Sequence, residues 1–260
     1  MRRKTVGAPS RRGQEWTHSD VDGNRIHNEI LLSLPLDESR LVFPKLELVR
    51  LRPRQVLHEV GDTLKSAYFC NGGLISILTS FPNGKNIEIA VVGTEGFVGL
   101  PLVAGFQSAA TRAIVQLEGT AFRIDASTLD PLLGQCTGLE RRLQQFSQMK
   151  SAQISQIAAC NLLHEVKERL ARWLLMCHDR NGSDTMALTQ ELLAEMLGTR
   201  RSSVTLAAGA LQKAGSIAYG RGQIRIQNRT RLTSAACECY EAMRRQARVW
   251  RNEARDGVGG

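Results

Sequence analysis

The chain has 260 residues, enough for two compact domains, and its hydrophobic fraction of 42% is ordinary for a globular protein. No apolar run approaches the roughly 20 residues that a membrane-spanning helix requires, so we expect no membrane segment. The formal net charge is +9, and the basic N-terminal stretch has no apolar segment behind it, which argues against a secretory signal peptide. We therefore expect a cytoplasmic protein with reduced cysteines.

The first part of the chain changes from a polar tail to strands. Residues 1–25 are basic and rich in polar residues, Gly, Pro and Ser, which predicts a disordered arm. From Leu46 to Ile124, short apolar runs alternate with turn residues, and Pro82-Asn83-Gly84 between two alternating runs is a strong hairpin signal. This pattern predicts a small β-barrel or sandwich, which we place in residues 26–135.

Residues 136–163 are expected to form a long helix, because the stretch from Leu139 to Leu163 contains neither Pro nor Gly. Its large apolar residues recur mostly three or five positions apart and make a narrow seam. A seam of this width suits a partner helix, so we expect a homodimer interface; the alternative is packing on the β domain of the same chain. The expected interface residues are Leu139, Leu143, Phe146, Met149, Ile154 and Ile157.

The stretch from Leu188 to Gly215 predicts two short helices joined by a turn at Gly198, where a helix end needs the left-handed conformation. Thr189 is placed to cap the first helix and Thr199 the second. The apolar positions of the second helix share one face: Val204, Ala207, Ala208 and Leu211. Its other face is short or basic, as in a helix that enters the DNA major groove. The stretch is predicted to be a helix-turn-helix.

Residues 216–227 alternate in hydrophobicity on both sides of Gly220-Arg221-Gly222, which predicts a β-hairpin. A hairpin directly after a helix-turn-helix makes a winged helix-turn-helix, which we place in residues 164–235. A C-terminal helix and tail are expected in residues 236–260.

Basic charge is concentrated in this module. From Arg200 to Arg251 there are eleven Arg or Lys residues against two acids, Glu238 and Glu241, which equals the net charge of the whole chain. Such a concentration is the footprint of a surface that binds phosphates. The expected DNA-binding residues are Thr189, Gln190, Arg200, Arg201, Ser202, Ser203, Thr205, Arg221 and Arg225.

Motifs for catalysis or metal binding are not evident. The chain has no G-x-S-x-G, P-loop or H-E-x-x-H pattern, so we expect no enzyme and no catalytic residue. No pair of its six cysteines has the C-x-x-C spacing of a zinc site, and we expect no metal. Cys237 and Cys239 could form a thiol switch, but two residues apart on a helix they would point to different sides. A thiol-based redox protein is therefore the weaker alternative.

The order of a small β domain, a long helix and a winged helix-turn-helix resembles the Crp/Fnr superfamily of bacterial transcription regulators, from about Asn28 to Leu232. The most specific stretches are LTQELLAEMLGTRRSSVTLAAGALQKAGSI and VLHEVGDTLKSAYFCNGGLISIL with NGKNIEIAVVGTEGFVGLPL. The resemblance implies an α+β protein: a cupin-like β-roll of the cyclic-nucleotide-binding type that senses an effector, a dimerisation helix, and winged domains that bind a palindromic operator beside RNA polymerase. The alternative is a cyclic-nucleotide-binding module without DNA binding.

The expected effector pocket departs from the family pattern. Members that bind cyclic AMP hold the ribose with a Gly-Glu pair and the phosphate with Arg-Ser or Arg-Thr. Here Gly99-Leu100 and Pro101 stand at the first pair, and Thr111-Arg112 reverses the second. A leucine cannot accept hydrogen bonds from ribose hydroxyls, so we expect weak or absent cyclic AMP binding, with the effector and any cofactor unknown. The expected pocket residues are Gly99, Leu100, Pro101, Leu102, Thr111 and Arg112.

Other family signatures differ too. The iron–sulfur branch uses clustered N-terminal cysteines, and none precedes Cys70; a haem sensor needs an axial ligand in the roll, where His58 is the only histidine. Well-known recognition helices carry Arg-Glu and a second Arg four residues later, where this chain has Arg201, Ser202 and Leu206. Arg201 can still contact guanine through two hydrogen bonds, but Ser202 and Leu206 cannot replace the other contacts. We therefore expect an operator unlike the family's best-known half-site.

Overall fold

The computed structural model describes residues 19–256, so residues 1–18 of the predicted arm lie outside it. The arm prediction is wrong for residues 19–25, which form a turn closed by a β-bridge between Ser19 and Arg25. Asp20 is buried and its Oδ1 atom accepts hydrogen bonds from the backbone N–H groups of Asp22 and Asn24. An aspartate that satisfies the backbone of its own turn stabilises a segment whose composition suggests disorder.

Two four-stranded antiparallel sheets make up the N-terminal domain. Their strands are β1 (Glu47–Leu51), β2 (Val56–His58), β3 (Ser66–Cys70), β4 (Leu74–Ser80), β5 (Asn86–Val92), β6 (Phe97–Val98), β7 (Arg112–Leu117) and β8 (Gly119–Asp125). The strand orders are β1-β8-β3-β6 and β2-β7-β4-β5. The predicted hairpin is confirmed, because β4 pairs with β5 across a turn in which Gly84 has φ 79°. The two apolar faces enclose a β-roll core.

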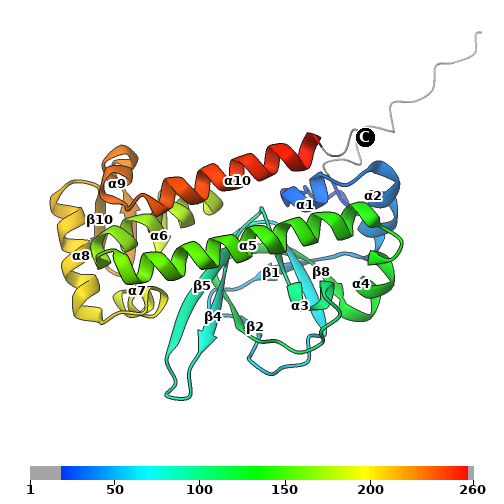
Figure 1. The fold of residues 1–260 in the computed structure, drawn as a ribbon, viewed down its shortest axis with the longest axis horizontal. Helices are drawn as coiled ribbons and strands as arrows, with labels where there is room; N and C mark the ends of the chain where they lie inside the picture. Colours follow the sequence, from blue (N-terminus) through cyan, green and yellow to red (C-terminus); the bar gives the residue numbers. More distant parts are fainter. Residues whose placement is uncertain (1–18, 257–260) are drawn as a thin grey trace, which may run out of the picture.

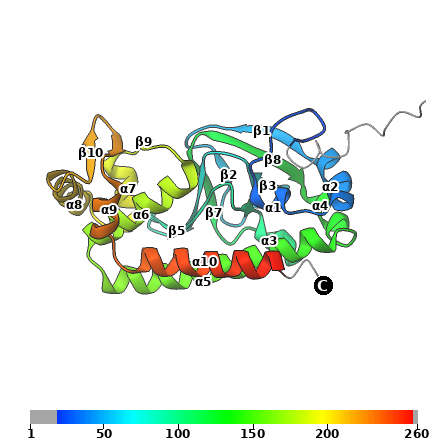
Figure 2. The ribbon, with the colours of Figure 1, turned by 90° about the horizontal axis from the view of Figure 1, so that it is seen from above.

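Short helices flank the roll: α1 (Glu29–Leu32), α2 (Leu36–Val42), the 3-10 helix η2 (Phe43–Lys45), α3 (Leu100–Val103) and α4 (Ala126–Leu133). The 27-residue α5 (Thr137–Leu163) connects the roll to the C-terminal domain. The last helix, α10 (Cys239–Asp256), follows the C-terminal domain in the chain. α10 lies beside α5 along one side of the molecule, as both views show (Figure 1, Figure 2). No described helix is long and apolar enough to cross a membrane.

The apolar seam of α5 packs within its own chain. Leu139, Leu143 and Phe146 are buried in the core of the roll, with Met149 packed against that core. Ile157 is buried in the second core, which the winged module shares with α10. The predicted dimer seam is therefore wrong for Leu139, Leu143, Phe146 and Ile157, because their burial leaves no surface for a partner. Met149 and Ile154 are half-buried, and for them the prediction stays open. A narrow apolar stripe fits a sheet of the same chain as well as it fits a second helix.

The winged module contains α6 (Val166–Asn181), β9 (Thr185–Ala187), α7 (Gln190–Leu197), α8 (Arg201–Lys213), β10 (Ile217–Gly220), β11 (Gln223–Ile226) and α9 (Arg229–Ala235). Thr189 caps α7 as predicted, since its hydroxyl accepts from the Leu192 N–H at 3.2 Å. Gly198 ends α7 with φ 58°. The prediction for Thr199 is wrong: Arg200 is the N-cap of α8 and makes no side-chain cap bond. Thr199 instead closes α7, donating its N–H to the Ala194 carbonyl.

The wing is a three-stranded sheet in the order β10-β11-β9. Arg221 and Gly222 form its two-residue turn, with φ values of 51° and 73°. Positive φ at both positions is the geometry that matches the twist of a tight hairpin. The sequence predicts this hairpin but not β9. This strand precedes the helix-turn-helix in the chain and pairs with β11, which follows it.

Candidate functional site

Helix α8 presents a polar face at one end of the molecule. Its four predicted apolar residues, Val204, Ala207, Ala208 and Leu211, are buried in the winged-module core. The opposite face, with Arg201, Ser202 and Thr205, is therefore exposed, and Leu206 on the same side is 77% exposed. Figure 1 shows α8 at the far end from the β-roll's flanking helices, where no other helix covers its outer side. A duplex can approach this face.

Gln190 organises the exposed face from the first turn of α7. Its Oε1 atom accepts hydrogen bonds from the Arg201 Nε at 3.3 Å and from the Thr205 hydroxyl at 3.0 Å. Arg201 also pairs with Glu191 at 2.8 Å, and both side chains remain more than 60% exposed, at 66% and 62%. An exposed pair contributes only about 0–1 kcal/mol, so Arg201 can exchange Glu191 for a base or phosphate at little cost. Glu191 is a neighbour that motif reasoning missed.

The other predicted DNA contacts fall on two sides of this face. Arg221 and Arg225 are exposed on the wing. Thr189 lies beside the turn of the wing, where the Leu188 N–H donates to the Gly222 carbonyl at 2.8 Å. Arg200 and Ser203 instead line a groove against the tip of the β4–β5 hairpin, which includes Lys85 and Asn86. Most of the predicted DNA-contacting residues thus lie together on the exposed face of α8 and on the wing. Arg200 and Ser203 lie apart from them, on the side of α8 that faces the roll.

The hairpin also fixes the helix-turn-helix to the roll. Asn86 donates its side-chain N–H to the Glu195 carboxylate at 3.0 Å. Ile87 packs so close to Gly198 that a side chain at that glycine would approach its methyl groups to 3.2 Å. The turn of the helix-turn-helix therefore rests directly on a strand of the β-roll.

The expected effector pocket is partly filled by the chain itself. Leu100 and Leu102 on α3 are half-buried and pack against the core of the roll, and α3 packs against both α4 and α5. Arg112, at the start of β7, has its Nε atom 3.2 Å from the Glu59 carboxylate. The cation expected to meet an effector anion is thus already paired. The Arg112 Nε atom makes no hydrogen bond and the Glu59 side chain is 51% exposed, so an effector anion would have to compete only with a weak ion pair in otherwise apolar surroundings.

Two family models match the chain: the cyclic nucleotide-binding domain over residues 48–136 and the Crp-like helix-turn-helix domain over residues 168–235. They match the two modules described above, in the same order. The chain belongs to the Crp/Fnr superfamily of transcription regulators.

Solved structures of other Crp/Fnr regulators share the fold. FixK2 from Bradyrhizobium japonicum has 18% identity and a TM-score of 0.63, over 74% of this chain and 98% of FixK2. The c-di-GMP responsive global regulator CLP from Xanthomonas campestris has 14% identity and a TM-score of 0.63, covering 75% and 100%. A Crp/Fnr regulator from Thermus thermophilus has 22% identity and a TM-score of 0.59, covering 73% and 98%. Among curated proteins, none matches the sequence significantly.

A buried charge network joins the three parts of this Crp/Fnr chain. Glu95, in the loop before β6, lies 3.1 Å from the Lys150 ammonium of α5 and 2.8 Å from the Arg180 guanidinium of α6. Burial alone would raise the pKa of Glu95, but the Arg180 and Lys150 charges outweigh it and hold the pKa at about 2. Burial lowers the pKa of Lys150 to about 8 against the attraction of Glu95. Sequence reasoning missed this network because its members come from separate elements.

A second buried carboxyl, Glu88, lies between the roll and α6. The Ser76 hydroxyl and the Trp173 indole donate to its two oxygens at 2.6 Å and 2.5 Å. Burial raises the pKa of Glu88 to about 7, since these bonds and the nearby Arg172 compensate only in part. We call Glu88, Glu95, Lys150, Arg180 and Trp173 the junction cluster.

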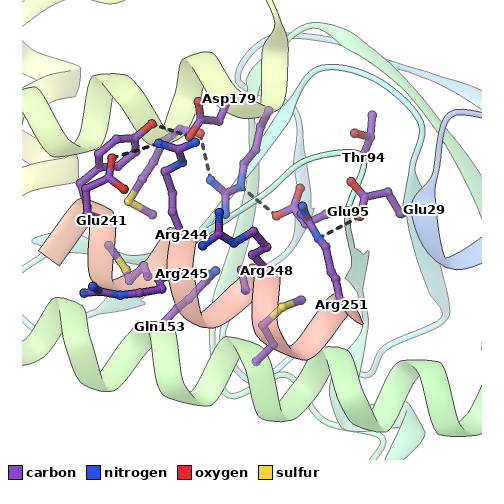
Figure 3. A pocket seen from close by; sticks show the side chains of 16 residues that line it. Glu29, Thr94, Glu95, Gln153, Asp179, Glu241, Arg244, Arg245, Arg248 and Arg251 are labelled. Carbon is purple, nitrogen blue, oxygen red and sulfur yellow. Dashed lines mark hydrogen bonds and ion pairs between the residues drawn. The ribbon is translucent and has the colours of Figure 1, made fainter. Parts of the chain in front are cut away.

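A cavity of about 600 Å³ lies between α10, α6 and the roll. Figure 3 shows Arg244, Arg245, Arg248 and Arg251 of α10 along its wall. Acids offset this charge: Glu29 lies 3.2 Å from Arg251, and Glu241 lies 2.9 Å from Arg244. The cavity therefore has a lining of mixed charge, in which acids pair with Arg244 and Arg251.

The prediction that Cys237 and Cys239 point to different sides is wrong. Cys237 precedes α10, which begins at Cys239, and both sulfur atoms turn toward the end of α5. There they meet Cys160 and His164, and the four potential ligand atoms all lie within 4.8 Å of one another. The signal that could have found this cluster is the C-x-x-x-H spacing of Cys160 and His164, which places a second potential ligand about one helical turn after the first.

Proposed function

We propose that this Crp/Fnr chain is a homodimeric regulator that binds a palindromic operator through α8 and the wing, beside RNA polymerase. The observation that carries the proposal is the exposed face of α8, where Arg201, Ser202 and Thr205 point outward beside a basic wing. A recognition helix of this shape reads base edges in the major groove, while basic residues around it neutralise phosphates.

The contacts divide by their position. Arg201, within the first turn of α8 and held by Gln190, is placed to read a guanine. Arg221 and Arg225 on the wing are placed to meet phosphates. Arg200, at the entrance of α8, is also assigned to a phosphate, because a helix N-terminus favours an anion.

Selection of bound sequences from random duplex DNA tests the proposal. We expect an enriched palindrome with two half-sites about one helical turn apart, bound by one dimer. A pool that stays random, or retention of no DNA at all, would contradict operator recognition and favour a regulatory module that does not bind DNA. The selected site then serves for every binding measurement below.

The dimer interface is assigned to the outward face of α5. Crp/Fnr regulators form dimers, and four of the six residues of the predicted seam are buried within the chain. The outward face carries the exposed small residues Ser151, Ser155 and Ala158 and ends in Leu162 and Leu163, which are 88% and 78% exposed. Small residues allow a second helix to approach closely, and exposed leucines gain free energy by burial.

Sedimentation tests this assignment. Leu162→Glu would place a carboxylate in the interface and is expected to shift the dimer to a monomer. Leu41→Glu, at an exposed leucine of α2, is the matched control and should leave the dimer intact. A wild-type monomer at micromolar concentration, or an unchanged Leu162→Glu dimer, would contradict the assignment.

We further propose that any effector of the roll differs from cyclic AMP. The side chains of Leu100 and Pro101 offer no acceptor for ribose hydroxyls, and Arg112 already lies 3.2 Å from the Glu59 carboxylate. Calorimetry is expected to show no binding of cyclic AMP at micromolar concentration. If an anionic effector does use the pocket, Arg112→Ala should remove the response.

A further inference from the structure

Four side chains with the chemistry of metal ligands meet where α5 ends and α10 begins. Cys160 lies in the last turn of α5, and His164 is its C-cap residue. Cys237 and Cys239 come from the segment that leads into α10, and Cys160 and Cys237 are 77 residues apart in the chain. All three cysteines are buried, and His164 is half-buried. The cluster is therefore built by tertiary structure and shielded from solvent.

The spacing of the ligand atoms fits one ion. Cys160 Sγ lies 3.4 Å from Cys237 Sγ, and Cys239 Sγ lies 3.8 Å from His164 Nδ1. A tetrahedral zinc site has metal–sulfur bonds of about 2.3 Å and metal–nitrogen bonds of about 2.0 Å, which gives edges of about 3.5–3.8 Å between ligand atoms. No pair in the cluster exceeds 4.8 Å. An iron–sulfur cluster needs wider separation, because several iron and sulfide atoms must fit between the sulfurs.

The groups around the four side chains support the same interpretation. The His164 Nε2 atom, on the other side of the ring from Nδ1, lies 3.1 Å from the Glu238 carboxylate. A carboxylate in this place orients the ring of a metal-binding histidine and raises its basicity. Gln156 donates its side-chain N–H to the Cys239 sulfur at 3.1 Å, as amides do to bound thiolates. Both partners hold the ligands ready for a metal.

Charge is balanced at the site as well. Three thiolates and one divalent ion carry a net charge of −1, which is costly to bury without a cation nearby. Arg172 of α6 is buried and interacts electrostatically with both Cys160 and Cys237. A buried arginine close to the sulfurs offsets the residual charge.

We propose that Cys160, His164, Cys237 and Cys239 bind one zinc ion in a closed tetrahedral site. Four protein ligands leave no open position, so the site stabilises structure and performs no catalysis. All four residues lie outside the ranges matched by the two family models, 48–136 and 168–235. The site therefore belongs to this chain's junction and its C-terminal helix and is not part of the shared domain pattern.

The position of the site defines what the ion holds together. The chain passes from α5 into α6 at residues 164 and 165, and it leaves α9 for α10 at residues 236–238. The ion would bind both connections at once, on either side of the winged module. It would thus fix the winged module to the end of the long helix.

Metal analysis of the full-length chain, purified with zinc and reductant and then dialysed, tests the proposal. We expect one zinc per chain, and loss of it in Cys160→Ser, Cys237→Ser and Cys239→Ser. Cys70→Ser and Cys177→Ser are matched controls at buried cysteines elsewhere and should keep the zinc. Cobalt substitution is expected to give the visible bands of a tetrahedral thiolate site, and these should vanish in Cys239→Ser.

Two variants at one position keep the proposal testable if the cysteine variants fail to fold. His164→Cys supplies a fourth thiolate and should retain one zinc, whereas His164→Ala should bind zinc at least tenfold more weakly in a chelator competition. Wild-type protein that holds no zinc, or cysteine variants that hold as much as wild type, would overturn the proposal. Finding iron and acid-labile sulfide in the protein, in place of zinc, would also overturn it. So would finding that Cys160 and Cys237 form a disulfide even in the presence of reductant.

Discussion

The junction cluster and the exposed face of α8 use charge in opposite ways. At the junction, Glu95 is shared by two cations in the interior, and its side chain is 7% exposed. On α8, Arg201 and Glu191 pair in solvent. Buried charges must keep their partners, because an unpaired charge in the interior costs several kcal/mol. Exposed charges can exchange partners at little cost. The first region therefore determines stability, and the second is available for binding.

The largest expected effect is from breaking the buried network. Glu95→Ala leaves Lys150 and Arg180 without their shared acid and should lower the free energy of unfolding by about 3–5 kcal/mol. The matched control is Glu118→Ala, which removes an exposed pair with Arg50 and should change stability little. Urea unfolding at pH 7 measures both. If the two substitutions lowered the free energy of unfolding equally, buried and exposed ion pairs would not differ in their contribution to stability.

The next effect depends on pH. The pKa of Glu88 rises from 4.5 unfolded to about 7 folded, so its contribution to stability is present below about pH 4.5 and is lost as the pH rises through 7. Relative to Glu88→Gln, wild type should lose about 3 kcal/mol between pH 4.5 and pH 8. Glu95 has the opposite sign, because its lowered pKa costs stability only as the pH falls from about 4.5 toward 2.

Urea unfolding of both proteins across this pH range measures the difference. The window excludes Glu95, which titrates at lower pH, and ends near the folded pKa of Lys150, about 8. If the difference in free energy of unfolding between wild type and Glu88→Gln does not vary with pH, the pKa of Glu88 is the same in the folded and unfolded chains, which would contradict the prediction.

On the exposed face, Arg201→Ala should cost about 1–3 kcal/mol in operator binding and relax preference at one guanine per half-site. Its effect on stability should be small, because Arg201 contributes only an exposed pair. Lys213→Ala, at the far end of the same helix, is the control and should not alter base preference. If Arg201→Ala weakens operator and scrambled DNA equally, α8 does not read the sequence through this residue.

The smallest effect is expected on the wing. Arg221→Asn removes a phosphate contact while Asn tolerates the φ of 51° at this turn. Binding to operator and scrambled DNA should weaken alike, and the salt slope should fall by about one unit per protomer. A salt series with both DNAs measures this. A change in base preference would instead show that Arg221 contacts base edges in a DNA groove and not a phosphate.

Local signals predicted the winged module well. Gly198 and the alternation around Arg221 each act within a few residues, so the turn and the hairpin could be inferred without tertiary structure. The packing direction of α5 could not, because Leu143 and Phe146 have the same spacing whether they meet a sheet or a second helix. Their burial in the roll became visible only with the fold.

The candidate sites show the same division. The outward direction of Arg201 and Thr205 follows from helix periodicity once the buried stripe is known. The pairing of Arg112 with Glu59, and the meeting of Cys160 with Cys237, depend on contacts between distant segments. No spacing rule within one element predicts such contacts.

The course of α10 beside α5 has a mechanical consequence for the joint between the domains. The chain crosses this joint twice, outward through α5 and back through α10, whose Arg251 reaches Glu29 of α1. A joint made of one helix can twist about the helix axis. Two helices side by side, held together at both ends, resist both twisting and sliding and permit mainly bending. Motion of the winged module relative to the roll is therefore expected to be a bend of the α5–α10 pair and not a rotation about the axis of α5.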